Sequence, residues 1–273
     1  MPQFLTLSAA HLLLIRKHTE FYMKKLILFF FLLANSWLIS AQGVNSLIKK
    51  ADSLETALNE TAAFQTFTQV LKLDARNYYA LWKCSELCSR IGNRQPTKEK
   101  KADYFKAGRI YAETAIKVNP KAADGYYALS VAMGRKALTE SGNERIKAVK
   151  EIKTNADKAI AINPNHGRAW HVLGKWHYEV SNLNGLEKAA LKLIYGGLPK
   201  SSLKESIKCY EKAKELEPVF ALNNLELAKA YHRNHEDAKA IPLLKQLPYL
   251  TAKTEDDGKI RTEGKKLLEK IED

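Results

Sequence analysis

The chain has 273 residues, of which 45% are hydrophobic and 27% charged, and 44 basic against 30 acidic residues give it a net charge of +14. This is the composition of an ordinary globular protein, and it excludes a disordered chain, which would contain fewer hydrophobic residues. Because only 13 Gly and 8 Pro are present, a turn-rich all-β fold is also disfavoured, and the many Ala, Leu, Lys and Glu residues favour helix.

The N-terminal region differs in composition from the rest of the chain. From Met23 it reads MKKLILFFFLLANSWLISA, in which two lysines precede an apolar run that ends at the small residues Ser40 and Ala41. This order is typical of a secretory signal peptide, and the run is shorter than the roughly 20 residues of a membrane-spanning helix. We therefore expect a cleaved signal peptide at 23–41, the alternative being an uncleaved anchor. Residues 1–22 are interpreted as an upstream start-codon artefact.

Export predicts a periplasmic location in a bacterium for the mature chain, residues 42–273, in which no transmembrane helix is expected. The mature chain has 40 basic and 29 acidic residues, a net charge of +11. Such a charge suits anionic partners such as phospholipid head groups or acidic proteins. A helical surface coated with lysine explains it equally well.

Helical periodicity begins near residue 44 and recurs to the end of the chain. A first helix pair precedes three longer units, and a shorter pair and a single helix follow them. The predicted repeats cover about 44–73, 77–120, 122–164, 166–218 and 220–248, with a capping helix at 254–271.

Equivalent positions of these repeats hold residues of the same kind. Two columns of large residues lie three positions apart, and a column of small residues follows the second. The columns are Leu81, Tyr126, Trp170 and Asn224; Cys84, Leu129, Leu173 and Leu227; and Ser85, Ser130, Gly174 and Ala228. Spacings of three and four place the large residues on one helical face, and the small residues allow a neighbouring helix to approach. The pattern resembles the tetratricopeptide repeat.

We therefore expect a single all-α domain, residues 42–273, built as a tetratricopeptide-like superhelical array of antiparallel helix pairs. The spacing between repeats exceeds the usual 34 residues, and the excess lies in lengthened loops between the two helices of each repeat. The longest of these inserts, 181–201, has room for a short helix of its own.

The histidine-rich stretch INPNHGRAWHVLGKWHY, residues 162–178, is interpreted as scaffold. Its histidines, His166, His171 and His177, are five and six residues apart, whereas two zinc ligands on one helix need a spacing of three or four. Trp170 falls in the first packing column, and His177 falls in a further column with Cys88, Met133 and Tyr231. No phosphate-binding glycine loop, nucleophile elbow or zinc-protease motif occurs. We expect no catalytic residue, no metal site and no cofactor, and hence no enzyme.

The three cysteines are too few for the disulfide framework of a stapled exported protein. Cys84 and Cys88 lie four residues apart on a predicted helix without further metal ligands nearby, and Cys209 is isolated. We interpret all three as small buried apolar residues.

A closer resemblance covers residues 146–232. The motif LGKWHYEVS runs from Leu173 to Ser181, and it is followed by Leu-Glu-Lys at 186–188 and by Pro199 and Ser201. In this pattern the chain resembles the regulator of microtubule dynamics family. The resemblance implies a tetratricopeptide protein, and for one branch of the family it implies binding and transfer of phospholipid. Microtubule binding is not expected in an exported bacterial protein.

Superhelical repeats bind partners along the concave face made by their first helices. By register we expect seven residues on this face. They are Trp82, Tyr127, His171, Lys175, Tyr178, Leu225 and Lys229. The face is then aromatic in its first repeats and basic in its last.

Such a groove suits an extended peptide with an acidic end, and it suits an acyl chain with its head group near Lys175 and Lys229. A third alternative is a face that binds nothing in particular. We expect a non-enzymatic envelope scaffold for a peptide or protein partner, with phospholipid or fatty-acid binding as the alternative and no nucleic-acid partner.

Overall fold

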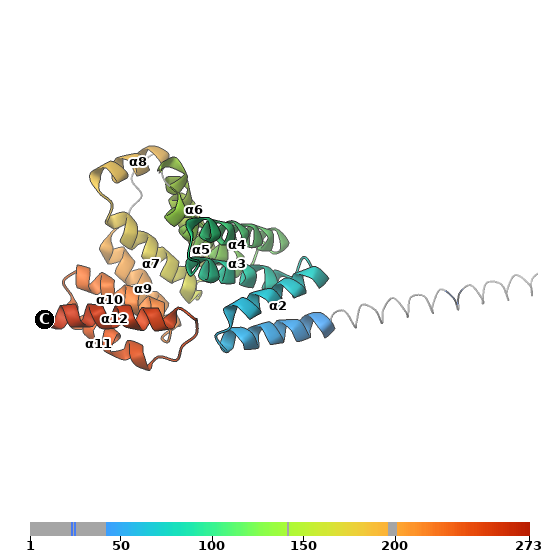
Figure 1. Ribbon diagram of the computed structural model, residues 1–273. Coiled ribbons are helices and arrows are strands. Elements are labelled where there is room, and N and C mark those ends of the chain that lie inside the picture. Colours follow the sequence, from blue (N-terminus) through green and yellow to red (C-terminus); the bar gives the residue numbers. More distant parts are fainter. Residues whose placement is uncertain (1–22, 24, 26–41, 141, 196–200) are drawn as a thin grey trace, which may run out of the picture. The chain divides into compact units, whose positions relative to one another are not determined.

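The computed structural model describes residues 23, 25, 42–140, 142–195 and 201–273, and within these ranges it contains helices and no strand (Figure 1). Leu47–Asp273 form one compact unit. The predicted start artefact and the predicted signal peptide lie outside the described residues, except for Met23 and Lys25. In the described part of the chain no helix is sufficiently long and apolar to cross a membrane.

A helix covers residues 42–56, and its part from Leu47 onward belongs to the compact unit. The helices after it are α2 (Glu60–Leu73), α3 (Tyr78–Asn93), α4 (Lys98–Val118), α5 (Ala123–Thr139), α6 (Gly142–Ile162), α7 (Gly167–Ser181), α8 (Gly185–Tyr195), α9 (Leu203–Leu216), α10 (Ala221–Arg233), α11 (Asp237–Gln246), the 3₁₀ turn η1 (Leu247–Tyr249) and α12 (Asp257–Glu272). The all-α repeat architecture expected from the sequence is confirmed.

Side-chain caps define where several of these helices begin. Asn77 accepts a hydrogen bond from the amide of Ala80 at 3.1 Å, and Ser202 accepts one from Glu205 at 3.1 Å. His166, the first histidine of the His-rich stretch, has the same role in α7, because its Nδ1 accepts from the amide of Ala169 at 3.2 Å. These bonds satisfy backbone donors that a helix leaves free in its first turn.

The helices pack in sequence as antiparallel pairs, α3 with α4, α5 with α6, α7 with α9, and α10 with α11. The first helices of the pairs also contact one another in the order α3, α5, α7 and α10, and α12 follows α10. We call the surface formed by α3, α5, α7, α10 and α12 the inner face. Its residues come from a long part of the chain, from Tyr78 to Glu272.

The insert between α7 and α9 forms α8, which contacts α6. Trp176 and Leu191 anchor it, since both are buried in one apolar cluster with Val180. The Trp176 indole nitrogen donates to the carbonyl of Val149 at 2.9 Å. Trp176 therefore holds the insert against α6.

Small residues permit the closest helix contacts, as the repeat pattern predicts. Ser85, Ser130 and Ala228 have no exposed surface. Gly174 lies against Tyr210, and a Cβ atom on Gly174 would be 2.8 Å from the tyrosine ring. The three cysteines are free and buried, which confirms their interpretation as core residues.

The two ends of the compact unit contact each other. The amide of Glu60 in α2 donates to Glu255 Oε1 at 2.7 Å, and the amide of Glu255 donates back to Glu60 Oε1 at 3.3 Å. Arg94 lies beside both, 2.7 Å from Glu60 and 3.1 Å from Glu255. The first helix pair is thereby joined to the segment that precedes α12.

Candidate functional site

A buried carboxylate stands at the centre of the α3–α5–α7 part of the inner face. Glu86 of α3 is 4% exposed, and its Oε1 accepts hydrogen bonds from Arg168 and, at 3.0 Å, from the Tyr127 hydroxyl. Arg90 and Lys83 lie 3.6 and 3.9 Å from its other oxygen. Burial alone would raise the pKa of Glu86, but Arg168, Arg90 and Lys83 together hold it well below its usual range.

The same cations connect Glu86 to the neighbouring helices. Lys83 and Arg90 both pair with Glu55 of the first helix, and Arg90 lies 3.2 Å from the fully buried Glu60. We call this set of ion pairs the Glu86 network. It cross-links three helix pairs through charges that are largely removed from water, where an ion pair is much stronger than at a surface.

A second cluster joins α7, α10 and α12. Glu226 of α10 accepts from Lys175 of α7 at 2.7 Å and from Lys229 at 2.9 Å, and Lys229 also reaches Glu263 of α12 at 2.7 Å. Lys175 and Lys229 are the two lysines of the basic end that the sequence predicts for the inner face, and each of them has a carboxylate partner.

The aromatic residues predicted for the groove are engaged in helix packing. Tyr127 is 6% exposed and bonded to Glu86. Trp82 is partly buried, with the Lys83 ammonium 5.2 Å from its ring centroid. Tyr178 is partly buried between Lys175 and Arg233, whose charged groups lie 5.5 and 5.0 Å from its ring.

The structure places Leu225 in the core and not on an open surface. Its side chain has no exposed area and belongs to the apolar cluster of α9, α10, α11 and η1. Leu225 follows Asn224, which belongs to the first column of large residues. A residue in this position faces the neighbouring first helix, and for α10 that neighbour is α12. A leucine in this position is covered completely.

His171 is also buried, at 8% exposure, between α7 and α10. Its Nδ1 lies 3.0 Å from Asn223 Oδ1. The Asn223 amide nitrogen donates to the carbonyl of Tyr210, so the Asn223 side-chain oxygen accepts a hydrogen bond from the imidazole Nδ1–H. His171 therefore orients α7 against α10, and it is not free to contact a ligand.

Lowering the pH from 7 to 5 is expected to reduce the free energy of unfolding by about 2 kcal/mol through His171. Burial lowers the pKa of His171 from 6.5 to about 4, so between these values the unfolded chain binds a proton that the folded chain does not. Stability is therefore highest above pH 6.5 and falls as the pH drops toward 4. Urea denaturation of His171→Gln should show a smaller loss, while His235→Gln, at an exposed turn, should match the unaltered protein.

Burial also lowers the pKa of His177, which will leave part of the pH dependence in the His171→Gln variant. If the His171→Gln and His235→Gln variants lost the same stability between pH 7 and pH 5, this result would contradict the interpretation of His171 as a buried neutral imidazole. Within the ranges that the structure describes, no group of three His, Cys, Asp or Glu side chains could hold a metal ion.

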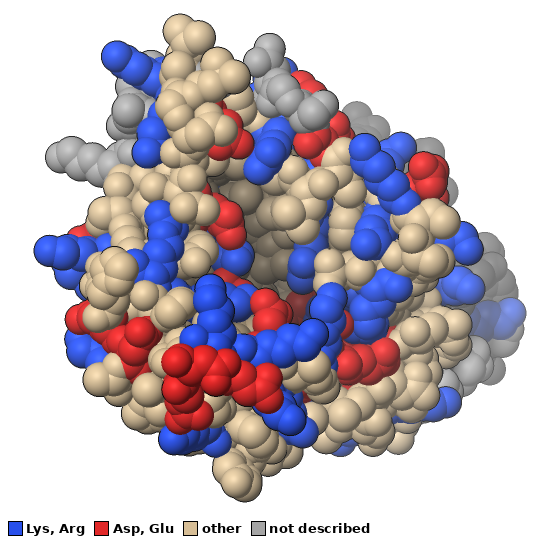
Figure 2. Space-filling view, turned by 60° about the vertical axis from the view of Figure 1, so that its left-hand side comes forward, with Lys and Arg blue, Asp and Glu red and all other residues tan. Residues whose placement is uncertain are grey.

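Several inner-face charges were missed in the sequence, namely Arg90, Arg94, Arg135, Arg168 and Glu226. The signal was present as a four-residue spacing of Glu86 and Arg90 on one face of α3, continued by Arg94 directly after the end of that helix. Such a stripe can equally be a solvated helix face, and only the contact with α5 and α7 shows that it is buried. Figure 2 shows basic and acidic side chains bordering a hollow of the molecule.

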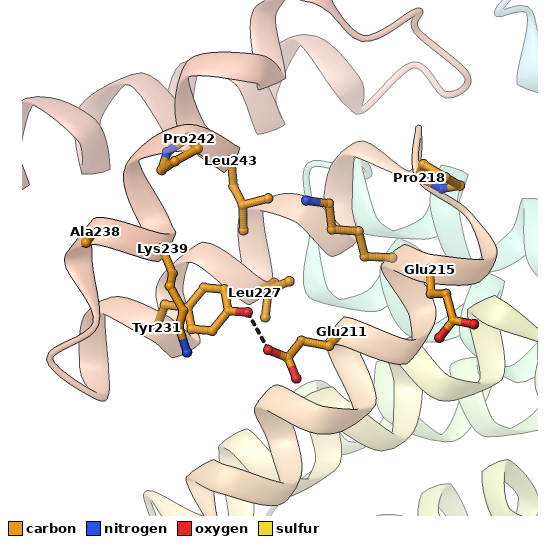
Figure 3. Close-up of a pocket in the computed structure, with 10 residues that line it drawn as sticks. Glu211, Glu215, Pro218, Leu227, Tyr231, Ala238, Lys239, Pro242 and Leu243 are labelled. Carbon is orange, nitrogen blue, oxygen red and sulfur yellow. Dashed lines mark hydrogen bonds between the residues drawn. The ribbon is translucent and has the colours of Figure 1, made fainter.

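A cleft of about 710 Å³ lies apart from the inner face, between α9, α10 and α11 (Figure 3). Leu227 and Tyr231 of α10 form its floor, and the Tyr231 hydroxyl donates to Glu211 of α9 at 2.5 Å. Pro242 of α11 lines the opposite side. The cleft carries both acidic and basic residues, so its charge indicates no particular ligand.

Capped antiparallel helix pairs, small residues at the closest helix contacts and a face made by the first helices define a tetratricopeptide-like helical-repeat protein. A thermophilic TPR protein of Thermus thermophilus has a similar fold, with a TM-score of 0.59 at 14% identity over 82% of this chain and 98% of that chain. At this identity the similarity concerns the fold alone.

The chain belongs to the family of regulator of microtubule dynamics proteins 1 to 3, whose family model matches residues 47–272. It is 27% identical to regulator of microtubule dynamics protein 3 of Rattus norvegicus over 217 residues, 77% of this chain and 46% of the relative. It is 23% identical to protein 1 of Bos taurus over 232 residues, 84% of this chain and 73% of the relative. The chain thus spans about half the length of the protein 3 relatives.

Proposed function

We propose that the protein is a non-enzymatic scaffold of the cell envelope, whose inner face binds an extended segment of a protein partner. The observation that carries the proposal is the alternation of charge along that face. Partly exposed charged groups of both signs occur on neighbouring helices, among them Lys175 at 42%, Glu263 at 50% and Arg168 at 33% side-chain exposure. A polypeptide can present charges of both signs to such a surface, whereas an acyl chain needs a continuous apolar one.

Phospholipid or fatty-acid binding is the competing hypothesis. The burial of residues that were predicted to line the groove argues against it. Tyr127 and Leu225 are almost fully covered by the protein itself. Trp82 is left partly exposed, with an ammonium group beside its ring. Transfer of an acyl chain to this face would bring it against desolvated ion pairs, which offer it no apolar surface.

Photo-crosslinking tests the proposal directly. A photoreactive phenylalanine analogue at Tyr178, on the inner face, is expected to give a covalent adduct with one protein when the chain is isolated from the periplasmic fraction. The same analogue at Tyr249, which is 86% exposed on η1, is the matched control and should not give that adduct. Adding Lys175→Glu should weaken binding about tenfold, or about 1.4 kcal/mol.

Native mass spectrometry of the purified protein distinguishes the two hypotheses. A lipid present in near-stoichiometric amount, or a lipid-sized adduct at Tyr178, would overturn the scaffold proposal in favour of lipid binding. Equal protein adducts at Tyr178 and Tyr249 would show that the inner face has no special role.

A further inference from the structure

Arg135 of α5 differs from Arg90, Arg94 and Arg168 on the inner face in its ion pairing. It follows Val131 by four residues and is partly buried. Its Nη1 donates to Asn93 Oδ1 at 3.1 Å, and among the described residues no carboxylate forms an ion pair with it. By contrast Arg90, Arg94 and Arg168 each pair with at least two carboxylates.

The electrostatic surroundings of the four arginines reflect this difference. Glu86 raises the pKa of Arg168 strongly, and carboxylates outweigh burial to raise the pKa of Arg90 and of Arg94. Burial lowers the pKa of Arg135, and Asp256 opposes that effect only in part. Arg135 is thus a partly buried inner-face arginine with which no described carboxylate forms an ion pair, and Asp256 acts on it only from beyond ion-pair distance.

A charge in such a position does not help the fold. Removing a cation from water costs free energy unless an anion compensates for it, and an apolar side chain of similar length avoids that cost. The guanidinium donates one hydrogen bond to the neutral amide of Asn93, and this bond fixes one end of it. The edge formed by Nε and Nη2 has no partner among the described residues, and this edge matches the two oxygens of a carboxylate.

We propose that Arg135 is an anchor for one carboxylate group of the bound protein segment, either its C-terminus or an Asp or Glu side chain. A singly charged carboxylate fits better than a phosphate group, because Glu86 and Asp256 already place negative charge on the same face and repel a second negative charge more strongly. The inference rests on the proposed function for the source of the carboxylate. The site itself can be tested with acetate.

The first test compares the same substitution at two arginines. Arg135→Met should raise the melting temperature by about 2–4 °C, the shift that corresponds to about 1 kcal/mol in a chain of this size. Arg168→Met is the matched control, and it should lower the melting temperature because Glu86 loses its closest cation. A fall for Arg135→Met as well would show that Arg135 stabilises the fold, and would overturn the proposal.

The second test observes the guanidinium itself, in the full chain labelled with ¹⁵N-arginine. The Arg135 Nε–H signal is identified by its absence from the Arg135→Met spectrum. Adding sodium acetate should shift it, compared with sodium chloride at the same ionic strength, while the signal of Arg109, which already pairs with Glu113 at 2.6 Å, should stay. An unchanged Arg135 signal would overturn the proposal.

Sodium phosphate provides the remaining comparison. The shift of the Arg135 Nε–H signal should saturate at a lower concentration of acetate than of phosphate. Saturation at a lower concentration of phosphate would overturn the assignment to a carboxylate and indicate a phosphate group instead. If acetate shifts the Arg135 signal but no protein adduct forms at Tyr178, the carboxylate site is supported and the scaffold function is rejected. Failure of the site and failure of the proposed function are therefore distinguishable.

Discussion

The Glu86→Ala variant is expected to lose about 3–5 kcal/mol of unfolding free energy, which is the usual result of removing one partner from a buried ion pair. The substitution leaves Arg168 without its nearest carboxylate, deprives Lys83 and Arg90 of one of theirs, and removes the acceptor of the Tyr127 hydroxyl. Lys83 and Arg90 remain almost entirely inside the protein, where water cannot replace the lost carboxylate. Urea denaturation followed by circular dichroism at pH 7 measures the change.

The matched control is Glu113→Ala on α4. Glu113 also pairs with an arginine, Arg109 at 2.6 Å, but both side chains are more than a third exposed. Exposed pairs contribute about 0–1 kcal/mol, so this variant should remain close to the unaltered protein. Similar losses for the two variants would mean that the Glu86 network is no stronger than a surface ion pair.

Acid should narrow the difference between the Glu86→Ala variant and the unaltered protein. The pKa of Glu86 in the fold lies below its ordinary value of 4.5. Stabilisation by this carboxylate is therefore complete above about pH 4.5 and is lost as the pH falls below it. A difference that stays constant from pH 7 to pH 3 would show that the loss comes from packing and not from charge.

Gly174→Val is expected to cost roughly 3 kcal/mol, at the upper end of the range for overpacked cores. A Cβ atom at this position would meet the Tyr210 ring at 2.8 Å, and Tyr210 has no exposed surface into which it could move. The Ser206 hydroxyl also donates to the Gly174 carbonyl at 2.8 Å, so the backbones of α7 and α9 cannot separate without breaking this bond. The midpoint of urea denaturation is the measurement.

Gly134→Val is the matched control, because Gly134 is likewise in the middle of a helix. The nearest atom to a Cβ at Gly134 is 4.0 Å away, in the side chain of Ile152. Valine is a slightly better helix former than glycine, so the stability should change by less than about 0.5 kcal/mol. A comparable loss in both variants would show that a glycine is needed in the helix and that the contact with Tyr210 is not the reason.

The residues of the first helices show how far a repeat register leads. Register correctly paired the small residue Gly174 with a close helix contact, because a repeated spacing of three and four specifies which residues share a face. It did not show how much of that face neighbouring helices cover. Tyr127, His171 and Leu225 were assigned to an open groove, yet each is buried against the next first helix.

Ion pairing was also beyond the reach of the sequence. Arg168 and Glu86 are 82 positions apart, and Arg94 and Glu255 are 161 apart, since 255 minus 94 is 161. Charged residues are common on helix surfaces, so neither pair has a local signature that separates a buried partner from a solvated one. That no carboxylate of the described residues forms an ion pair with Arg135 likewise becomes visible only in the tertiary structure.

The sequence by itself determined that this protein is an all-helical repeat, that its cysteines are core residues and that its family is that of the regulators of microtubule dynamics. Each of these follows from local spacing or from a motif, which the chain carries whatever its tertiary contacts. Only the tertiary structure decided which inner-face charges are paired and which aromatic residues are covered. Both depend on the distance between helices from different repeats, because desolvation and Coulomb energy are properties of side chains brought together in space.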